Sequence, residues 1–350
     1  MTVTPEHAAA QFDIGPLTEA PTPNPGGHIH RNWVVATAAG RFLLQSLNTA
    51  VFADIEVLQD NTARIGEHLR ARGVDSPRLQ AGLDGRWWWQ GPDGSAWRVF
   101  EFVEGRRLAG AVDASAVGRA FGRFAVTVAT LPGPPLAPAI PGFHDLAARQ
   151  QALAAAEAGA PVDRLRESAA QRATVAAHAD LASTFSGEPG AVAHGDAKAA
   201  NVLIDPTGRR DPLVVDLDTT GPAPLAIDAG DLIRSCAVVA AEDEPDLDRV
   251  VLDEGLLLAV IGGWLAELDA GPTGAKVPEP AAIIRAGKAI CWEQAVRFLT
   301  DHLDGDRYYP VSRPGHNLDR ARTQLRLLEQ LDANDARLEA AVAAVRPGGR

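Results

Sequence analysis

Two pairs of short apolar runs lie in the first hundred or so residues, and each pair predicts a β-hairpin. Residues 30–37 and 41–47 each contain such a run and are joined by the turn Ala38-Ala39-Gly40. Residues 86–90 and 97–104 have the same character and flank Gly91-Pro92-Asp93-Gly94. The Pro-Asp-Gly sequence favours a turn because proline fixes φ and glycine accepts a positive φ.

Apolar residues at helical spacing predict a helix at residues 54–72, whereas residues 13–27, rich in Pro, Thr and Gly, predict a loop. From about residue 108 the chain is alanine-rich and mainly helical. Helices are predicted at 111–131, 145–185 with a break at 159–161, 227–270, 279–303 and 317–345, with short β-rich pieces at 192–204 and 212–218.

This order of elements predicts an α+β protein with two lobes and a cleft between them. A small β-rich lobe of residues 1–104 is followed by a larger, mainly helical lobe of residues 105–350. The chain has 350 residues, of which 46% are apolar, so it is long enough for each lobe to bury a core.

The net charge of the chain argues against one class of partner. The formal net charge is −12 and no basic stripe is found, so a nucleic-acid partner is not expected.

The two cysteines, Cys236 and Cys291, have neither disulfide nor zinc spacing. Residues 1–12 lack a signal-peptide pattern, and no apolar run approaches the roughly 20 residues of a membrane span. We therefore expect a cytoplasmic protein without a membrane partner, and its oligomeric state stays open.

Two neighbouring segments of the larger lobe carry the residue types that phosphoryl transfer needs. Asp196 stands five residues before Asn201, an apolar strand follows the asparagine, and Asp216 ends the next apolar strand. One carboxylate can orient an attacking hydroxyl and take its proton, while an amide oxygen and a second carboxylate can hold Mg²⁺ against the phosphates. Lys198, inside the same loop, can stabilise the transferring phosphoryl group.

Two alternatives stand beside this interpretation. Asp196 and Asn201 could be ordinary turn and capping residues, but the preceding His194-Gly195, the strand after each segment and the second carboxylate favour catalysis. A kinase-like protein that only binds nucleotide is the other alternative. The presence of all three polar residues argues against it.

The segment 194–201 resembles the catalytic loop of the protein-kinase-like superfamily, in the form found in aminoglycoside phosphotransferases and choline kinases. Further motifs resemble those of bacterial N-acetylhexosamine kinases and span roughly residues 26–330. These motifs are residues 45–52, 143–145 with 149, 215–219, 228–234, 297–303 with 305–306, and 316–318 with 320–324. The resemblance implies a protein-kinase-like fold and a kinase that uses ATP or GTP with Mg²⁺. By this resemblance Asp196 is the catalytic base, and Asn201 and Asp216 bind Mg²⁺.

The same resemblance implies nucleotide contacts in the small lobe. Gly26 and Gly27 would open the loop over the phosphates, although a plain turn is the alternative for this pair. Glu101 to Val103 would form the hinge that meets the adenine through backbone groups. Many kinases place a lysine on the strand after the loop, but the small lobe contains no lysine and Gln45 occupies the equivalent place. Mg²⁺, backbone N–H groups or an arginine must then meet the phosphate charge.

The resemblance also implies acceptor contacts. Arg297 and Asp301 lie in the part that is similar to the acceptor site of sugar kinases, and His144 is a further candidate. The favoured acceptor is an N-acetylhexosamine phosphorylated at its anomeric hydroxyl, and an aminoglycoside or nucleoside antibiotic is the alternative. Asp228 and Asp231 are expected to brace the catalytic loop through buried hydrogen bonds.

Overall fold

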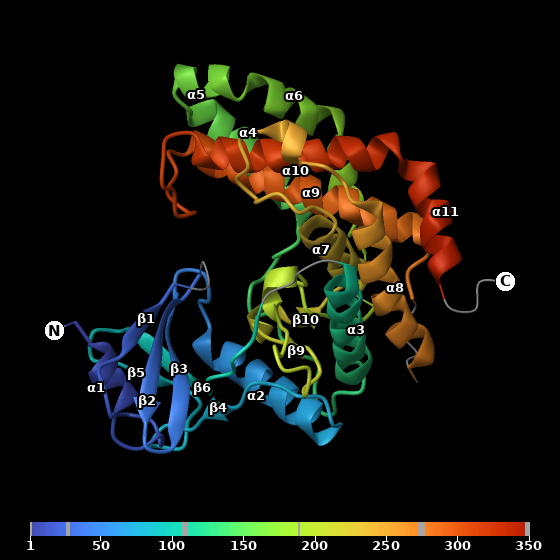
Figure 1. The fold of residues 1–350 in the computed structure, drawn as a ribbon. Coiled ribbons are helices and arrows are strands. Elements are labelled where there is room, and N and C mark those ends of the chain that lie inside the picture. Colours follow the sequence, from blue (N-terminus) through green and yellow to red (C-terminus); the bar gives the residue numbers. More distant parts are fainter. Residues whose placement is uncertain (1, 26–28, 107–110, 188–189, 272–276, 347–350) are drawn as a thin grey trace. The chain divides into compact units, whose positions relative to one another are not determined.

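The computed structural model describes residues 2–25, 29–106, 111–187, 190–271 and 277–346. By the density of its contacts the chain divides into two compact units (Figure 1). The first unit comprises residues 1–106, 130–141 and 203–221, and the second comprises residues 107–129, 142–202 and 222–350. The first unit therefore contains Asp216, whereas the second contains Asp196 and Asn201.

The first unit is built on an antiparallel sheet in which six described strands take part. The order is β1-β2-β3-β6-β4, and β5 also pairs with β6. The bounds are β1 (Thr22–Asn24), β2 (Arg31–Thr37), β3 (Gly40–Leu47), β4 (Leu79–Gln80), β5 (Trp89–Gln90) and β6 (Ala96–Glu101). Both predicted hairpins are confirmed, because β2 pairs with β3 and β5 with β6.

Helices cover the two faces of this sheet in Figure 1. The short helix α1 (Pro5–Ala9) packs with Leu44, Trp97 and Val99 in one apolar cluster. The helix α2 (Ile55–Ala71), capped by the Asp54 side chain, packs with Leu47 and Ala96 on the other face. Because side chains alternate along a strand, Gln45 and Arg98 point to the α2 face as well.

Two local predictions for the first unit differ from the structure. The predicted loop 13–27 contains β1, in which Pro23 lies opposite Trp33 on β2. Proline lacks the N–H that a central strand needs, so its place is an edge strand such as this one. The predicted strand 86–90 is limited to Trp89 and Gln90.

The second unit is mainly helical. The chain passes from the second unit to the first within β8 (Val202–Leu203), and it returns to the second within β10 (Gly221–Pro222). The elements between them, β9 (Leu213–Val214) and the 3-10 helix η3 (Leu217–Thr219), belong to the first unit. The second unit contains α3 (Ala111–Val128), α4 (Leu146–Gly159), α5 (Val162–Glu167), α6 (Ala169–Ala177), η1 (Ala179–Ser183), β7 (Val192–Ala193), η2 (Ala199–Asn201), α7 (Ala226–Cys236), η4 (Leu247–Arg249), α8 (Glu254–Ala270), α9 (Pro280–Leu303), α10 (His316–Ala333) and α11 (Asp335–Val345).

Several predicted helices are interrupted in the structure. Residues 145–185 form α4, α5, α6 and the 3-10 helix η1 rather than two helices. Residues 227–270 form α7 and α8, separated by a segment without α-helix. The Asp253 side chain accepts the backbone N–H of Leu256 and begins α8 as a separate helix. The segment 192–204 was predicted to be β-rich. It contains only strands of two residues, because the backbone turns between them, around Asp196.

Glycines allow α3 and α8 to approach each other closely, and the two helices lie side by side in Figure 1. A Cβ atom on Gly118 would lie 1.9 Å from the backbone oxygen of Val260, and one on Gly263 would lie 2.3 Å from that of Ser115. Neither contact can be relieved by turning a side chain, because both partners are backbone atoms. The helix α3 also packs against the segment that contains Asp196, since Phe121 and Phe124 of α3 contact the ring of His194.

We expect Gly118→Ala to destabilise the second unit, because α3 and α8 would have to move apart. Overpacking of this kind lowers the free energy of unfolding by about 1–3 kcal/mol. Thermal denaturation measures the loss. The matched control is Gly159→Ala at the end of α4, where an added Cβ meets nothing within 4 Å. An unchanged melting temperature for Gly118→Ala would contradict the close packing.

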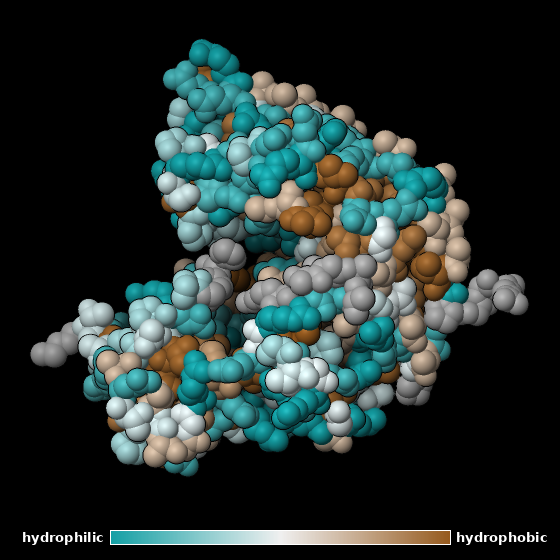
Figure 2. All heavy atoms as spheres, in the orientation of Figure 1, coloured by the Kyte–Doolittle hydropathy of each residue, from teal (hydrophilic) through white to brown (hydrophobic). Residues whose placement is uncertain are grey.

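Among the described residues, none of the helices has both the length and the apolar run required to cross a membrane. Figure 2 shows a mostly polar surface on which apolar residues gather over part of the second unit. Large apolar side chains with high exposure include Val239 (85%) and Val251 (57%). Scattered apolar exposure of this kind is ordinary on a protein surface.

Candidate active site

The segment 193–201, called the catalytic loop here, is held by backbone bonds to a buried carboxylate. The side chain of Asp228 in α7 accepts the backbone N–H groups of His194 and Gly195, each at 2.9 Å. Gly195 has φ +79°, a conformation that glycine adopts without strain. The expected bracing role of Asp228 is therefore confirmed. Asp231 instead pairs with Arg234 of the same helix at 2.7 Å.

Asp196, Lys198 and Asn201 converge in this loop. The Asp196 Oδ2 atom accepts Lys198 Nζ at 2.7 Å and Asn201 Nδ2 at 2.9 Å. The same amide nitrogen also donates to the backbone carbonyl of Asp196 at 2.9 Å. Both N–H groups of the Asn201 amide are thus directed to Asp196. Its amide oxygen is left to accept a donor or a cation.

The charge of Asp196 is stabilised in the folded protein. Burial by itself would raise its pKa, but the Lys198 ammonium, His194 and the Asn201 hydrogen bond lower the pKa to about 2. Asp196 is therefore ionised at neutral pH. A carboxylate in this state can accept a hydrogen bond from a hydroxyl and align it for attack.

His144 links the catalytic loop to α9. Its Nδ1 atom lies 2.7 Å from Glu293 Oε2, and its Nε2 atom lies 2.7 Å from the carbonyl oxygen of Gly195. Glu293 is fully buried. The Arg149 Nε atom lies 3.9 Å from the other oxygen of Glu293. Both ring nitrogens of His144 thus face protein atoms.

The guanidinium of Arg297 lies among aromatic rings beside the catalytic loop. It is 5.4 Å from the centre of the Phe143 ring and 5.8 Å from that of Tyr309. Burial alone would lower the pKa of Arg297, but Tyr309, Glu293, Tyr308 and Asp196 raise it, so the guanidinium stays charged. A fixed positive charge near Asp196 can meet a phosphoryl or acceptor oxygen.

Asp301 organises the segment 304–315 that follows α9. Its two carboxylate oxygens accept the backbone N–H groups of Arg307, Tyr308 and Tyr309 at 2.7 to 2.9 Å, and the Asn317 side chain at 2.8 Å. These four bonds fix the backbone that presents the two tyrosines. A contact between Asp301 and the acceptor stays a prediction.

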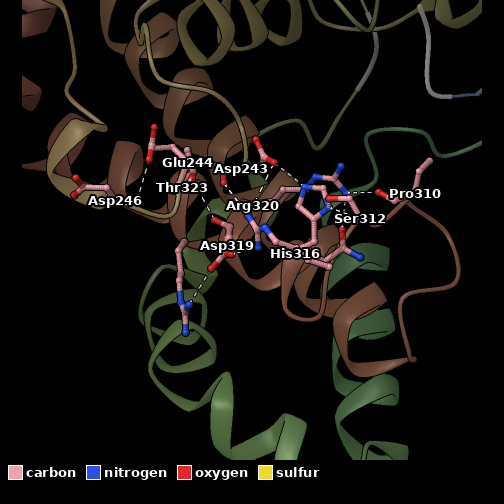
Figure 3. A network of polar contacts seen from close by, with 12 residues as sticks. Asp243, Glu244, Asp246, Pro310, Ser312, His316, Asp319, Arg320 and Thr323 are labelled. Atoms are coloured by element: carbon pink, nitrogen blue, oxygen red, sulfur yellow. Dashed lines mark hydrogen bonds and ion pairs between the residues drawn. The ribbon is translucent and has the colours of Figure 1, made fainter. Parts of the chain in front are cut away.

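A second polar network holds the far end of the same segment, as Figure 3 shows. The His316 Nδ1 atom accepts the backbone N–H of Ser312 at 3.1 Å, and its Nε2 atom lies 2.8 Å from Asp243. Arg320 donates to the carbonyl oxygen of Pro310 at 3.1 Å. Both ends of the segment that carries Tyr308 and Tyr309 are thereby fixed to α10.

In the first unit, a row of polar side chains crosses the sheet. The register places Asn32, Gln45 and Arg98 side by side on β2, β3 and β6. Gln45 donates to Asn32 Oδ1 at 2.9 Å and accepts from Arg98 Nε at 2.8 Å. Gln45 therefore makes its side-chain contacts within the sheet. Its predicted contact with a nucleotide stays a prediction.

Arg98 connects this row of side chains to Asp218, two residues after Asp216. Its two terminal nitrogens each donate to one oxygen of Asp218 at 2.7 Å, and both side chains are almost fully buried. His30 Nε2 also lies 2.7 Å from Asp218, while His30 Nδ1 accepts the backbone N–H of Asn48 at 3.1 Å. Burial alone would raise the pKa of Asp218, but Arg98 and His30 hold it well below its usual range. Asp218 is thus tied to β6 through Arg98, and through His30 to the residues that precede β2 and follow β3.

Asp216 itself has φ 64° and ψ 59°, in the left-handed region that residues other than glycine rarely adopt. Such a conformation persists only where the surroundings enforce it, and it is common at functional sites. The Arg98–Asp218 pair anchors the chain two residues further on. A carboxylate such as that of Asp216 is an oxygen ligand that suits a hard cation such as Mg²⁺. Its predicted role as a metal ligand, together with Asn201 of the second unit, stays a prediction.

The other predicted nucleotide contacts are Glu101, Val103, Gly26 and Gly27. Glu101 is exposed, with Arg78 Nε at 3.9 Å, and its backbone N–H donates to the Arg78 carbonyl at 2.8 Å. Val103 is partly buried. Gly26 and Gly27 lie outside the described residues. In the part of the chain that the structure describes, no three or more His, Cys, Asp or Glu side chains form a metal cluster.

Two buried side chains, Arg98 and Glu293, and the contact of Arg98 with Asp218 were not predicted from the sequence. A signal was present, because Arg98 and Glu293 are each a charged residue inside a mainly apolar stretch, at 96–100 and at 289–296. A buried charge is expensive unless it is paired, so such a position indicates a partner.

Similar solved structures share the fold. An aminoglycoside phosphotransferase from Alicyclobacillus acidocaldarius has a TM-score of 0.64 at 15% identity, over 98% of each chain. An amicoumacin kinase in complex with AMP-PNP, Ca²⁺ and Ami has a TM-score of 0.59 at 13% identity, over 92% of this chain and 91% of the other. A choline kinase from Cryptosporidium parvum has a TM-score of 0.51 at 14% identity, over 91% of each chain. The predicted α+β, protein-kinase-like fold is confirmed.

The sequence also matches a known family. Residues 21–264 fit the pattern of the family described as "Phosphotransferase enzyme family". This stretch contains the catalytic loop and Asp216, and it makes up more than half of the 350 residues. The chain therefore belongs to the phosphotransferase enzyme family, and it is a kinase that phosphorylates a hydroxyl group of its acceptor.

Proposed function

We propose that this kinase transfers the terminal phosphoryl group of ATP or GTP to the anomeric hydroxyl of an N-acetylhexosamine. Phosphoryl transfer is supported above all by one observation, which is that Lys198 and Asn201 both bond to the ionised carboxylate of Asp196. The choice of acceptor is supported by the sequence motifs at 143–149 and 297–306 and by the charge beside the catalytic loop.

In this proposal Asp196 is the catalytic residue that receives the acceptor hydroxyl. The hydroxyl donates its hydrogen bond to Asp196, the new bond forms between its oxygen and the terminal phosphorus, and the bond from phosphorus to the bridging oxygen breaks. The hydroxyl proton passes to Asp196, and the nucleoside diphosphate leaves. A carboxylate with a low pKa suits this role, because in a loose transition state the proton is transferred late and alignment matters most.

Lys198 and Arg297 supply positive charge around Asp196. Lys198 Nζ lies 2.7 Å from the carboxylate, from where it can turn to an oxygen of the transferring group. Arg297 is close enough to Asp196 for their charges to interact. Both cations can stabilise the negative charge that spreads over the phosphoryl oxygens in the transition state.

Asn201 and Asp216 are proposed to hold Mg²⁺. When bound, Mg²⁺ neutralises charge on the phosphates. The Asn201 amide is oriented for this task, since both of its N–H groups are directed to Asp196 and its oxygen is left for a ligand. Residues 1–104 are proposed to clamp the nucleotide, with Gly26, Gly27, Gln45, Glu101 and Val103 as its contacts.

The rings of Phe143, Tyr308 and Tyr309 support a ring-shaped acceptor. Tyr308 and Tyr309 lie at 4.8 Å between ring centres, and their backbone is fixed by Asp301. Aromatic faces pack against the apolar faces of a sugar ring, while Arg297 can donate hydrogen bonds to its hydroxyl oxygens. His144 and Asp301 are proposed to contribute at the same place, directly or through the backbone that they hold.

An aminoglycoside or nucleoside antibiotic is the second candidate acceptor. The acidic net charge of −12 favours a cationic acceptor in general. The guanidinium of Arg297 beside Asp196 disfavours one locally, because like charges repel in a partly buried site. We therefore place the neutral sugar first.

A nucleotide-consumption assay with Mg²⁺ tests this proposal across a panel of acceptors. The panel contains N-acetylglucosamine, N-acetylgalactosamine, glucosamine, galactose, aminoglycosides and nucleoside antibiotics, each with ATP and with GTP. We expect turnover with an N-acetylhexosamine, no turnover with its methyl glycoside, in which the anomeric hydroxyl is blocked, and none after chelation of the metal. Turnover with an antibiotic alone would contradict the sugar assignment and leave the reaction class unchanged.

A further inference from the structure

His144 occupies a position from which it can control the backbone of the catalytic loop. Its Nε2 atom is 2.7 Å from the carbonyl oxygen of Gly195, the residue directly before Asp196. Its Nδ1 atom is 2.7 Å from Glu293 in α9. The ring also packs edge-on against Phe143, with 4.6 Å between ring centres. A shift of this imidazole would therefore move the peptide that carries the proposed base.

The two partners determine the protonation state of the ring. A carbonyl oxygen only accepts hydrogen bonds, so Nε2 must carry a proton. Glu293 is fully buried, and burial by itself would raise its pKa, but His144, Arg297 and Arg149 lower it. Glu293 is therefore a carboxylate, and Nδ1 must carry a proton too. The geometry describes an imidazolium between an anion and a carbonyl oxygen.

The charges around His144 favour the protonated form of its ring. Burial alone would lower the pKa of His144, but Glu293, the Gly195 carbonyl and Asp231 of α7 raise it above its usual value. Two cations, Arg149 of α4 and Arg297 of α9, face the same glutamate and compete for its charge. The protonated ring is present below the raised pKa and is lost as the pH rises through it.

We propose that the His144 imidazolium is a positioning residue for phosphoryl transfer, which ties the Gly195 carbonyl to Glu293 and so fixes Asp196 against the acceptor hydroxyl. The proposal rests on the assignment of Asp196 as the base, made above. It differs from a direct contact between His144 and the acceptor, because both ring nitrogens are engaged within the protein. Deprotonation removes one of the two hydrogen bonds and releases the loop.

The test measures kcat and the KM for the acceptor from pH about 6 to about 9. It uses whichever compound of the acceptor panel turns over fastest, so it does not depend on the acceptor being a sugar. We expect His144→Gln to lower kcat about 10- to 100-fold near neutral pH with little change in KM, because a misplaced catalytic group loses rate rather than affinity. The decline of kcat on the alkaline side should be lost in this variant.

Glu293→Gln provides a second variant. Without the glutamate charge, His144 should lose its proton at a lower pH, and the alkaline decline of kcat should move to lower pH with it. The matched control is His178→Gln. His178 also has both ring nitrogens bonded, to Thr174 and Asp332 at 2.8 Å, and a raised pKa, but it does not touch the catalytic loop. This control should leave kcat and its pH profile unchanged.

A spectroscopic measurement completes the test without any acceptor. The ring resonances of His144, assigned by their loss in His144→Gln, should titrate above the ordinary value of about 6.5. Titration at or below that value would overturn the proposal, as would a His144→Gln variant that raises the KM at every pH and keeps kcat. Turnover by Asp196→Asn would overturn the base assignment separately, because the ring titration does not depend on it.

Discussion

Asp196→Asn is expected to abolish phosphoryl transfer while leaving the affinity for Mg·nucleotide largely intact. Asparagine keeps the size of the side chain but cannot take the acceptor proton, and removal of a general base lowers kcat about 10²- to 10⁴-fold. Lys198 also loses the carboxylate that it contacts at 2.7 Å. The assay measures kcat with the best acceptor of the panel, and nucleotide binding is measured separately by fluorescence or calorimetry.

The pH dependence adds a check on Asp196. Because its pKa is lowered to about 2, the carboxylate charge is present above that pH and is lost only as the pH falls through it. A decline of kcat between neutral and mildly acidic pH must therefore come from another group. Asp163→Asn is the matched control, since the Asp163 side chain is 82% exposed on α5. Full activity of Asp196→Asn would show that the base is misassigned.

Asp218→Asn is expected to destabilise the first unit strongly. The substitution leaves the Arg98 guanidinium buried without its counter-charge, and breaking a buried, hydrogen-bonded pair on one side costs about 3–5 kcal/mol of the free energy of unfolding. Because Asp216 lies two residues away in a left-handed conformation, we also expect weaker Mg·nucleotide binding. Denaturant unfolding and nucleotide titration measure the two effects.

A double-mutant cycle measures the coupling between Arg98 and Asp218 apart from their interactions with other residues. Arg98→Met should destabilise the unit by a similar amount, and Arg98→Met combined with Asp218→Asn should cost clearly less than the sum of both. The matched control is Arg86→Met. The Arg86 side chain is 66% exposed and lies 3.8 Å from Asp84, so its loss should change stability by about 0.5 kcal/mol or less. Additive effects of Arg98→Met and Asp218→Asn would contradict a direct coupling.

The sequence was sufficient for features that depend on neighbouring residues. The hairpins of β2–β3 and β5–β6 were predicted from short apolar runs on both sides of a turn, one of them a Pro-Asp-Gly turn, because turn chemistry is local. The bounds of α2 and α9 followed from helical spacing. The segment 193–201 was proposed as the catalytic loop from the spacing of its polar residues, and the bonds that Asp228 makes to it were predicted correctly.

Local patterns were insufficient where several weak signals compete. The break between α4 and α5 was predicted at 159–161 and is confirmed. The breaks between α5 and α6 and between α7 and α8 were missed, because the helical pattern was extended across them. The edge strand β1 was missed because Pro and Thr also suit a loop. Its strand conformation comes from pairing with β2, which is a contact between segments.

Only the tertiary structure decided which polar side chains meet. Gln45 and Arg98 are 53 residues apart, and Arg98 and Asp218 are 120 apart, yet the sheet register and the backbone after Asp216 bring them together. His144 and Glu293 are 149 residues apart. A sequence shows that a buried charge needs a partner, but the partner depends on packing. The sequence by itself was sufficient to predict the reaction class, since the proposed reacting groups lie close together in the chain, and the tertiary structure determined which side chains hold them in place.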